Sequence, residues 1–324
     1  MTSEPLTITL KTLTPLWTGG VDGTCDRLHE TGLIGSLRWW YEALVRGLGG
    51  YACDPTSEDR CPDKDGNRCV ACELFGCTGW GRKFRLEAPA EVELVQIRGN
   101  LKAIKQGQEI EVKIVPLRPM AEEEWCLLQA TFRLISEYGA IGGKTVFKPS
   151  DEKSRAGEFH HLDFGLVQIQ TQNWTCEKSL DLDNVKSYLT SDKWRKGDPK
   201  EYSWASLENF WCVQGRYLAR QNGNTSTFNQ VIGRKQPKSQ AQQIEQGNVN
   251  EWLAGKQQES KKVFSFKGPD GKGRTFGFVK PDLVSFGEMK VRLGQVWSDF
   301  MPDQEFRTGA EILQSLFSSG GGAE

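Results

Sequence analysis

The chain has 324 residues, with 41 Lys plus Arg against 42 Asp plus Glu, so its formal net charge is −1. This balance excludes a strongly cationic protein that coats nucleic acid through its bulk field, although a local basic groove remains compatible with it. Hydrophobic residues make up 37% of the chain and charged residues 26%, which is typical of a folded globular protein. No apolar run is long enough to span a bilayer and no signal peptide precedes the first strand, so we expect a cytoplasmic protein without membrane contact.

Hydrophobic patterns predict a regular order of elements in the first half of the chain. Residues 6–10 alternate as in a half-buried strand, and residues 33–48 place large apolar side chains at helical spacing. Strand character returns at 82–97 and 110–115, and a helix over 120–138 and a strand over 163–170 follow. The order β, α, insertion, β-hairpin, α, β is that of a ferredoxin-like α+β unit over residues 1–172.

Residues 173–318 are expected to form a second, less regular α+β half. Aromatic residues favour a helix over 204–221, and a polar stretch rich in Gln, Asn and Ser predicts a long loop over 222–260. Residues 261–267 and 274–280 predict a hairpin, and a last helix is expected over 308–317. The short tail, residues 319–324, is predicted to be disordered.

Five of the nine cysteines fall between Cys53 and Cys77, in an insertion at about residues 51–80. The pair Cys69-x2-Cys72 puts two thiolates on one turn, at a separation that suits one tetrahedral ion. Thiolate ligands favour zinc over magnesium or calcium, and an iron–sulfur cluster is an alternative. The spacing therefore predicts a structural zinc site with Cys53, Cys61, Cys69 and Cys72 as ligands and Cys77 as a replacement for one of them. The competing interpretation is that these cysteines are scattered small hydrophobic residues.

Two glycine-rich loops are candidate anion-binding sites. Thr18-Gly19-Gly20 follows the first strand, and the stretch from Gly139 to Lys144 follows the second long helix. Backbone amides beside glycine can approach a phosphate closely, and Arg38 and Lys144 are available to supply charge. Each loop taken alone is equally compatible with an ordinary turn.

Four ordered segments resemble one family. The stretches from Leu10 to Gly20, Gly35 to Trp40, Glu73 to Thr78 and Gly139 to Lys144 resemble the RAMP superfamily subunits of type III CRISPR effector complexes. The likeness is closest to the first-numbered, capping subunit family of the Cmr module. It implies a ferredoxin-like (RRM-type) fold with a second, degenerate ferredoxin-like half. It also implies a ribonucleoprotein that serves antiviral defence and assembles from a CRISPR RNA (crRNA), other RAMP or Cas subunits and target RNA.

The resemblance also implies which residues touch RNA. By position these are Gly142, Gly143 and Lys144 in the second loop and Arg38 at the start of the first helix, while Thr18, Gly19 and Gly20 would line the same groove. Such a subunit would grip the crRNA backbone toward its 3′ end. Zinc-binding insertions also occur among related subunits. The chain departs from the family in one respect, because its second loop carries Lys144 instead of several arginines.

Three further candidates for RNA contact lie outside these loops. Residues 231–280 carry an excess of basic over acidic residues with Phe interleaved, and Lys272 and Arg274 lie in their hairpin. The alternative is a solvated hairpin whose Phe side chains are in the core. Trp39 lies off the apolar stripe of its helix, so it is a candidate for a stacking contact.

A catalytic role is the alternative function. Related RAMP subunits cut target RNA with an aspartate in the loop after the first strand, and this loop contains Asp26 and Asp22 with His29 close by. A carboxylate there could hold Mg²⁺ or position the 2′-hydroxyl, so Mg²⁺ is expected only in this case. Aspartates in such loops also commonly make turn hydrogen bonds. The sequence favours a binding subunit over an endoribonuclease, and a stand-alone zinc-containing RNA-binding protein is a third hypothesis.

Overall fold

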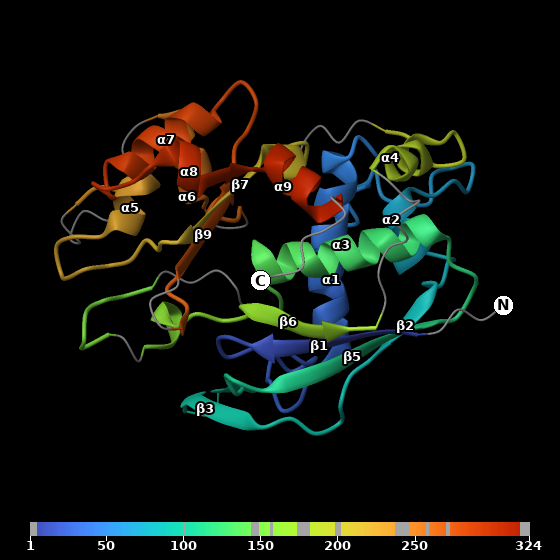
Figure 1. The fold of residues 1–324 in the computed structure, drawn as a ribbon, viewed down its shortest axis with the longest axis horizontal. Helices are drawn as coiled ribbons and strands as arrows, with labels where there is room; N and C mark the ends of the chain where they lie inside the picture. Colours follow the sequence, from blue (N-terminus) through green and yellow to red (C-terminus); the bar gives the residue numbers. More distant parts are fainter. Residues whose placement is uncertain are drawn as a thin grey trace.

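The computed structural model describes residues 5–99, 101–143, 149–155, 158–173, 182–197, 202–236, 247–256, 259–269 and 273–317. Within these residues it contains two four-stranded antiparallel sheets and a separate two-stranded hairpin. Figure 1 shows the first sheet beneath two long helices, the second sheet and its short helices to one side of them, and α4 and α9 above them. Lys144, Lys272 and the predicted tail lie outside the described residues.

The first sheet has the strand order β2-β5-β1-β6. Its strands are β1 (Leu6–Thr12), β2 (Phe84–Glu87), β5 (Glu109–Pro116) and β6 (Val167–Gln172). Along β1 the buried residues are Leu6, Ile8, Leu10 and Thr12, with half-buried residues between them, so the predicted alternation is confirmed. The strand predicted over 82–97 is two strands, β2 and β3 (Leu94–Arg98), and β3 pairs in a hairpin with β4 (Leu101–Ile104), which the sequence pattern did not predict.

Helices α1 (Glu30–Gly47) and α3 (Glu122–Glu137) cover one face of this sheet (Figure 1). Both confirm the predicted helices. The Glu124 carboxylate accepts the backbone N–H of Ala121 at 2.9 Å, which satisfies a donor at the start of α3. The short helix α2 (Val70–Phe75) lies inside the cysteine-rich segment, and its residues Val70, Ala71, Leu74 and Phe75 are buried in the main core. Helix α2 and the four cysteines are therefore part of the core, while most of residues 54–68 are exposed.

The second sheet has the order β10-β7-β9-β8. Its strands are β7 (Phe210–Gly215), β8 (Val263–Phe266), β9 (Gly273–Phe278) and β10 (Phe306–Thr308). If the four strands of each sheet are numbered in chain order, both sheets have the order 2-3-1-4, the second sheet being counted from β8 to β10. The remaining elements are α4 (Leu182–Thr190), α5 (Thr227–Val231), α6 (Asn248–Ala254), α7 (Phe286–Gly294), α8 (Pro302–Glu305), α9 (Gly309–Phe317) and the 3₁₀ turns η1 (Phe159–His161) and η2 (Leu207–Asn209).

Two predictions in the second half are wrong. The helix expected over 204–221 is instead η2 followed by β7, because β7 is a central strand with Phe210 to Val213 all buried. Such a strand has neither alternation nor a helical stripe. The loop expected over 222–260 contains α5 and α6, and the Ser226 hydroxyl accepts the N–H of Asn229 as the N-cap of α5. Residues 237–246 of that stretch lie outside the described residues.

The two halves share one core. The Trp40 ring lies 5.7 Å from the rings of both Phe210 and Phe276. Helix α9 returns to α3, where Arg133 donates to the carbonyl oxygen of Leu316 at 2.8 Å. Among the described residues, no helix is long and apolar enough to cross a membrane.

Candidate functional site

The two glycine-rich loops meet at Trp17. The backbone N–H of Gly143 donates to the carbonyl oxygen of Trp17 at 2.9 Å, and that of Gly142 donates to the Ser36 hydroxyl on α1 at 3.2 Å. A Cβ atom at Gly19 would lie 2.3 Å from Cη2 of Trp17, and one at Gly143 would lie 2.7 Å from its Cζ3. The indole ring thus lies against both loops, and a side chain at either glycine would collide with it. Gly19, Gly20 and Gly142 are half-buried and Gly143 is exposed.

Thr18 faces the interior. Its hydroxyl donates to the carbonyl oxygen of Arg27 at 3.3 Å and accepts the N–H of His29 at 3.0 Å. The side chain is fully buried, so it organises the loop that enters α1. The whole residue, backbone included, is 0% exposed, so Thr18 does not line an open groove in this structure. Arg27, in contrast, is exposed in the same loop; sequence reasoning overlooked it, although a basic residue between Gly20 and the first helix was a usable signal.

The two candidate catalytic aspartates lie on the exposed part of this loop. Asp22 accepts hydrogen bonds from the backbone N–H of Thr24 at 2.9 Å and from its hydroxyl at 2.8 Å. These bonds, the backbone one first, lower the pKa of Asp22 and form the local turn that such residues commonly make. Asp26 Oδ1 lies 2.7 Å from Nε2 of His29. Since a Cβ at Gly20 would lie 2.9 Å from Cε1 of His29, this pair adjoins the glycine loop.

Arg38 points away from the loops and toward the cysteine segment. Its Nε donates to Glu42 Oε1 at 2.7 Å, Nη1 to the carbonyl oxygen of Gly76 at 3.0 Å and Nη2 to Sγ of Cys72 at 3.2 Å. Burial alone would lower the pKa of Arg38, but the Glu42 carboxylate and the Cys72 sulfur outweigh it and raise the pKa. The guanidinium predicted to touch RNA is thus engaged inside the molecule.

Trp39 and Arg274 lie at the junction of the two halves. The Trp39 ring, 36% exposed, makes edge-to-face contacts with Trp40 at 4.9 Å and Phe278 at 5.6 Å. Arg274 donates to the carbonyl oxygens of Gly139 at 2.6 Å and Ser136 at 2.8 Å, at the C-terminal end of α3. These bonds occupy the Arg274 guanidinium within the fold, where it caps the C-terminal end of α3, and its contact with RNA stays a prediction.

The four predicted metal ligands come together in the structure. The sulfur atoms of Cys53, Cys61, Cys69 and Cys72 all lie within 4.8 Å of one another, and the four residues are buried. Zinc–sulfur bonds of about 2.3 Å give a tetrahedron with edges of about 3.8 Å, so the four thiols can hold such an ion after small shifts. Cys77 is not a member of this group, and its backbone pairs with Trp80 in a turn.

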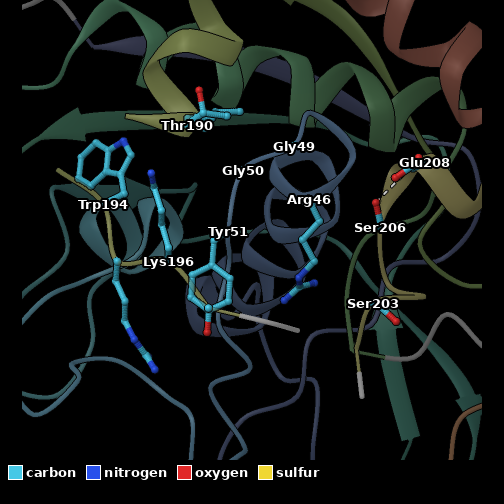
Figure 2. A pocket seen from close by; sticks show the side chains of 13 residues that line it. Arg46, Gly49, Gly50, Tyr51, Thr190, Trp194, Lys196, Ser203, Ser206 and Glu208 are labelled. Atoms are coloured by element: carbon cyan, nitrogen blue, oxygen red, sulfur yellow. Dashed lines mark hydrogen bonds between the residues drawn. The ribbon is translucent and has the colours of Figure 1, made fainter. Parts of the chain in front are cut away.

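A cavity of about 520 Å³ adjoins the cysteine group (Figure 2). Its polar side chains are engaged within the protein: Arg46 donates to the carbonyl oxygens of Ala52 at 3.1 Å and Ala205 at 3.0 Å, and the Tyr51 hydroxyl donates to Asp59 at 3.0 Å. These bonds brace the end of α1 against the cysteine segment, and they point to no particular ligand.

Comparison with known proteins gives the following similarities. The model of the RAMP superfamily matches residues 9–147, and no curated protein matches the sequence. Among solved structures, the chain is similar to apo Cmr1 from Pyrococcus furiosus, with 10% identity, a TM-score of 0.48 and 97% of both chains covered.

Two further similar chains come from type III-B Cmr-beta complexes. One complex is bound to cognate target RNA and AMPPnP in the presence of single-stranded DNA (11% identity, TM-score 0.48, 90% of this chain and 98% of that chain). The other is bound to cognate target RNA (11% identity, TM-score 0.43, 97% and 99%). At these identities and TM-scores, the likeness to solved structures assigns no function. The family match covers the stretch from β1 to the second glycine-rich loop. Residues 9–147, under half of the chain, are therefore similar to the RAMP superfamily.

Proposed function

We propose that the chain is an RNA-binding structural subunit of a type III CRISPR–Cas ribonucleoprotein, of the capping Cmr kind. It holds the crRNA backbone toward its 3′ end, helps to capture target RNA and assembles with other RAMP and Cas subunits in the cytoplasm. The observation that carries this proposal is the meeting of the two glycine-rich loops at Trp17, within the segment that matches the RAMP superfamily.

The proposal includes a ferredoxin-like fold for both halves of the chain. In a ferredoxin-like unit, two β-α-β crossovers interleave so that the first and third strands lie in the middle of an antiparallel sheet. The order β2-β5-β1-β6 supports this for the first half, with α1 and α3 as the two helices. The order β8-β9-β7-β10 supports a second, degenerate unit, with α7 in the second crossover.

The proposed grip on RNA combines close approach at the glycines with nearby positive charge, because the N–H groups of Gly20, Gly142 and Gly143 are bonded within the protein. Gly143 is exposed and Gly19 and Gly20 are half-buried, so an RNA backbone can approach the main chain closely at both loops. Arg27 and Lys144 supply positive charge, Trp39 supplies an aromatic edge and Lys272 remains a proposed contact in the β8–β9 hairpin. Contacts of this kind fix the position of the RNA backbone, while base pairing between guide RNA and target RNA reads the sequence.

The cysteine group is proposed to hold a structural zinc ion. Four thiolates from Cys53, Cys61, Cys69 and Cys72 complete a tetrahedral coordination sphere and leave no position for a reactive water. The ion would stabilise the short segment around α2 on the flank of α1.

One observation favours an endoribonuclease as the second candidate. Asp26 and His29 form a 2.7 Å pair in the loop beside Gly20, and a carboxylate–imidazole pair can act on a 2′-hydroxyl or bind Mg²⁺. The assembled complex, incubated with complementary RNA and Mg²⁺, separates the two functions. An unchanged cleavage pattern in Asp26→Asn supports the binding subunit, and the loss of one cleavage site supports the enzyme.

Retention of RNA by the co-purified complex tests the binding function directly. We expect Arg27→Ala and Lys144→Ala to weaken binding uniformly across RNA sequences and to reduce the salt slope by about one for each lost phosphate contact. Arg307→Ala is the matched control, because Arg307 is exposed on β10 in the second half. A complex that purifies without RNA, or salt slopes equal to that of the control, contradicts the proposal.

A further inference from the structure

Two arginines from outside the cysteine segment donate hydrogen bonds to sulfur atoms of the four-cysteine group. Arg38, on α1, lies 3.2 Å from Sγ of Cys72 through Nη2. Arg195, in the turn after α4, lies 3.6 Å from Sγ of Cys61 through Nη1. The side chains of these arginines are 19% and 10% exposed, so both guanidinium groups are largely removed from water.

The negative charge of the four-cysteine group with a bound metal ion favours cations close to its sulfur atoms. Four thiolates bound to a divalent ion leave two surplus negative charges, and the four cysteines are buried. A buried charge is costly unless it is paired and hydrogen-bonded. Arg38 and Arg195 bring a positive charge close to two different sulfur atoms and so lower the local cost of this negative charge, while each arginine also pairs with a carboxylate. Glu42 pairs with Nε of Arg38, and Asp59 and Asp63 pair with Nη2 and Nε of Arg195, so Nη2 of Arg38 and Nη1 of Arg195 are the groups that reach sulfur.

We infer that Arg38 and Arg195 are positioning residues of the metal centre, which hold the thiolates of Cys72 and Cys61 and increase the affinity of the site for its ion. This inference rests on the proposed zinc site and deepens it. Partners of this kind orient metal ligands and tune their donor strength, and their loss commonly lowers metal affinity by about 10- to 100-fold.

The shape of the guanidinium group suits this role better than a lysine does. Arg38 binds Cys72 through Nη2 and the carbonyl oxygen of Gly76 through Nη1 at 3.0 Å, which uses its planar fork. Arg195 binds both Cys61 and the carbonyl oxygen of Asp59, at 2.9 Å, through Nη1, while its Nη2 pairs with the Asp59 carboxylate. In addition, the backbone N–H of Arg195 donates to the carbonyl oxygen of Arg68, next to Cys69, at 2.8 Å. The two arginines thereby connect α1 and the turn after α4 to opposite parts of the metal-binding segment.

The test compares metal binding by the full unaltered chain and by variants that lack one guanidinium group. Each protein is loaded with Co²⁺, and Zn²⁺ is then added to displace the Co²⁺. In Arg38→Gln and Arg195→Gln we expect the Zn²⁺ affinity to fall about 10- to 100-fold. The cobalt–thiolate charge-transfer band should also move to lower energy, because a thiolate that loses an N–H donor becomes a stronger electron donor. A purely structural role of the arginines would not move this band.

Two arginines elsewhere in the chain provide matched controls. Arg133 resembles Arg38, with a glutamate four residues on and bonds to carbonyl oxygens, and Arg216 resembles Arg195, with two carboxylate partners. Neither is bonded to a cysteine, so Arg133→Gln and Arg216→Gln should leave the metal affinity and the band unchanged.

The outcomes separate this inference from the proposed zinc site. An unaltered chain that binds no stoichiometric Zn²⁺ or Co²⁺ refutes the site itself. A chain that binds metal, with variants whose affinity and band equal those of the controls, refutes only the role of the arginines. Should Arg38→Gln fail to fold, Arg38→Lys replaces it, because lysine keeps the charge without the planar fork. If both Arg38→Lys and Arg195→Gln leave the metal affinity and the charge-transfer band unchanged, the inference is overturned.

Discussion

Gly143 donates its backbone N–H to the carbonyl oxygen of Trp17 over 2.9 Å, and this bond joins two loops that are far apart in the sequence. The Trp17 ring lies against Gly19 of its own loop as well, so one buried indole determines how closely the loops approach each other. The spacing of the two loops in the proposed RNA path therefore depends on the absence of side chains at Gly19 and Gly143. Substitution of a glycine by alanine measures this dependence.

We expect Gly19→Ala to destabilise the fold and to weaken RNA retention. The new Cβ would lie 2.3 Å from Cη2 of Trp17, so the ring must move within a packed core at a cost of about 1–3 kcal/mol. Urea unfolding and RNA binding by the complex measure the two effects.

Gly35→Ala is the control for this substitution. Gly35 lies in α1 with no atom within 4 Å of an added Cβ, and alanine there should stabilise the helix by about 0.5–1 kcal/mol. If Gly19→Ala were as stable as Gly35→Ala and bound RNA equally well, Trp17 would not control the spacing of the loops.

Removal of the metal is expected to unfold the cysteine-rich segment around α2, which lies beside α1. In Cys69→Ser/Cys72→Ser, two of the four sulfur ligands are lost, so zinc content should fall to background and the Tm should decrease, since α2 then lacks the ion that orders it. Metal analysis and thermal unfolding provide the measurements. Cys77→Ser should retain zinc and Tm, because Cys77 is not in the group; zinc content unchanged in the double variant would eliminate the site.

The stability of the contact between Asp163 and the β8–β9 hairpin should depend on pH. Burial raises the pKa of Asp163 to about 6, although the N–H groups of Gly268 and Lys267 oppose this shift. Because the folded state binds the proton more tightly than the unfolded state, this group contributes stability below pH 4 that is lost as the pH rises to about 6. The loss is at most about 3 kcal/mol.

Asp163→Asn should remove this contribution. The free energy of unfolding, measured from pH 4 to pH 7, should fall less steeply with rising pH in the variant than in the parent chain. Asp65→Asn, at an exposed position of the cysteine segment, should reproduce the parent curve. Parallel curves for Asp163→Asn and the parent would show that the carboxyl titrates normally in the folded protein.

Sequence patterns were sufficient for β1 and α1, which have one buried and one exposed face, although the amphipathic helices α4 and α7 were missed. Strand β1 alternates strictly, and helix α1 repeats Leu33, Leu37, Trp40 and Leu44, so periodicity identifies both. The cysteine spacing likewise predicted the group of four that the structure brings together, because a CxxC pair constrains geometry locally. Strand β7 was missed for the opposite reason, since a central strand buried on both faces has no period to detect.

The partners of long polar side chains could not be predicted from the sequence. Arg38 follows a motif that resembles an RNA contact, but its acceptors Gly76 and Cys72 come from a segment whose position depends on the folded core. Arg195 carries no motif at all, and its contact with Cys61 arises only because the turn after α4 pairs with the backbone of Arg68. The hydrogen-bond partners of such side chains depend on tertiary packing and not on the spacing of residues in the sequence.

Arg274→Gln tests whether this residue stabilises the fold or binds RNA. Its guanidinium donates to the carbonyl oxygens of Ser136 and Gly139, where α3 ends and its negative dipole end favours a cation. Loss of these charged, buried hydrogen bonds should lower the free energy of unfolding by about 2–3 kcal/mol. Denaturant unfolding measures this change.

RNA binding by the same variant decides between the two roles. Because the Arg274 donors are occupied at the junction of the two halves, RNA retention per folded complex should stay at the parent level, with the same salt slope. Arg307→Gln, on an exposed side chain of β10, should change stability by less than about 0.5 kcal/mol. A variant of Arg274 that keeps its stability but loses RNA with a reduced salt slope would restore the RNA contact that the hairpin sequence first indicated, and would mean that the bonds to α3 open when RNA binds.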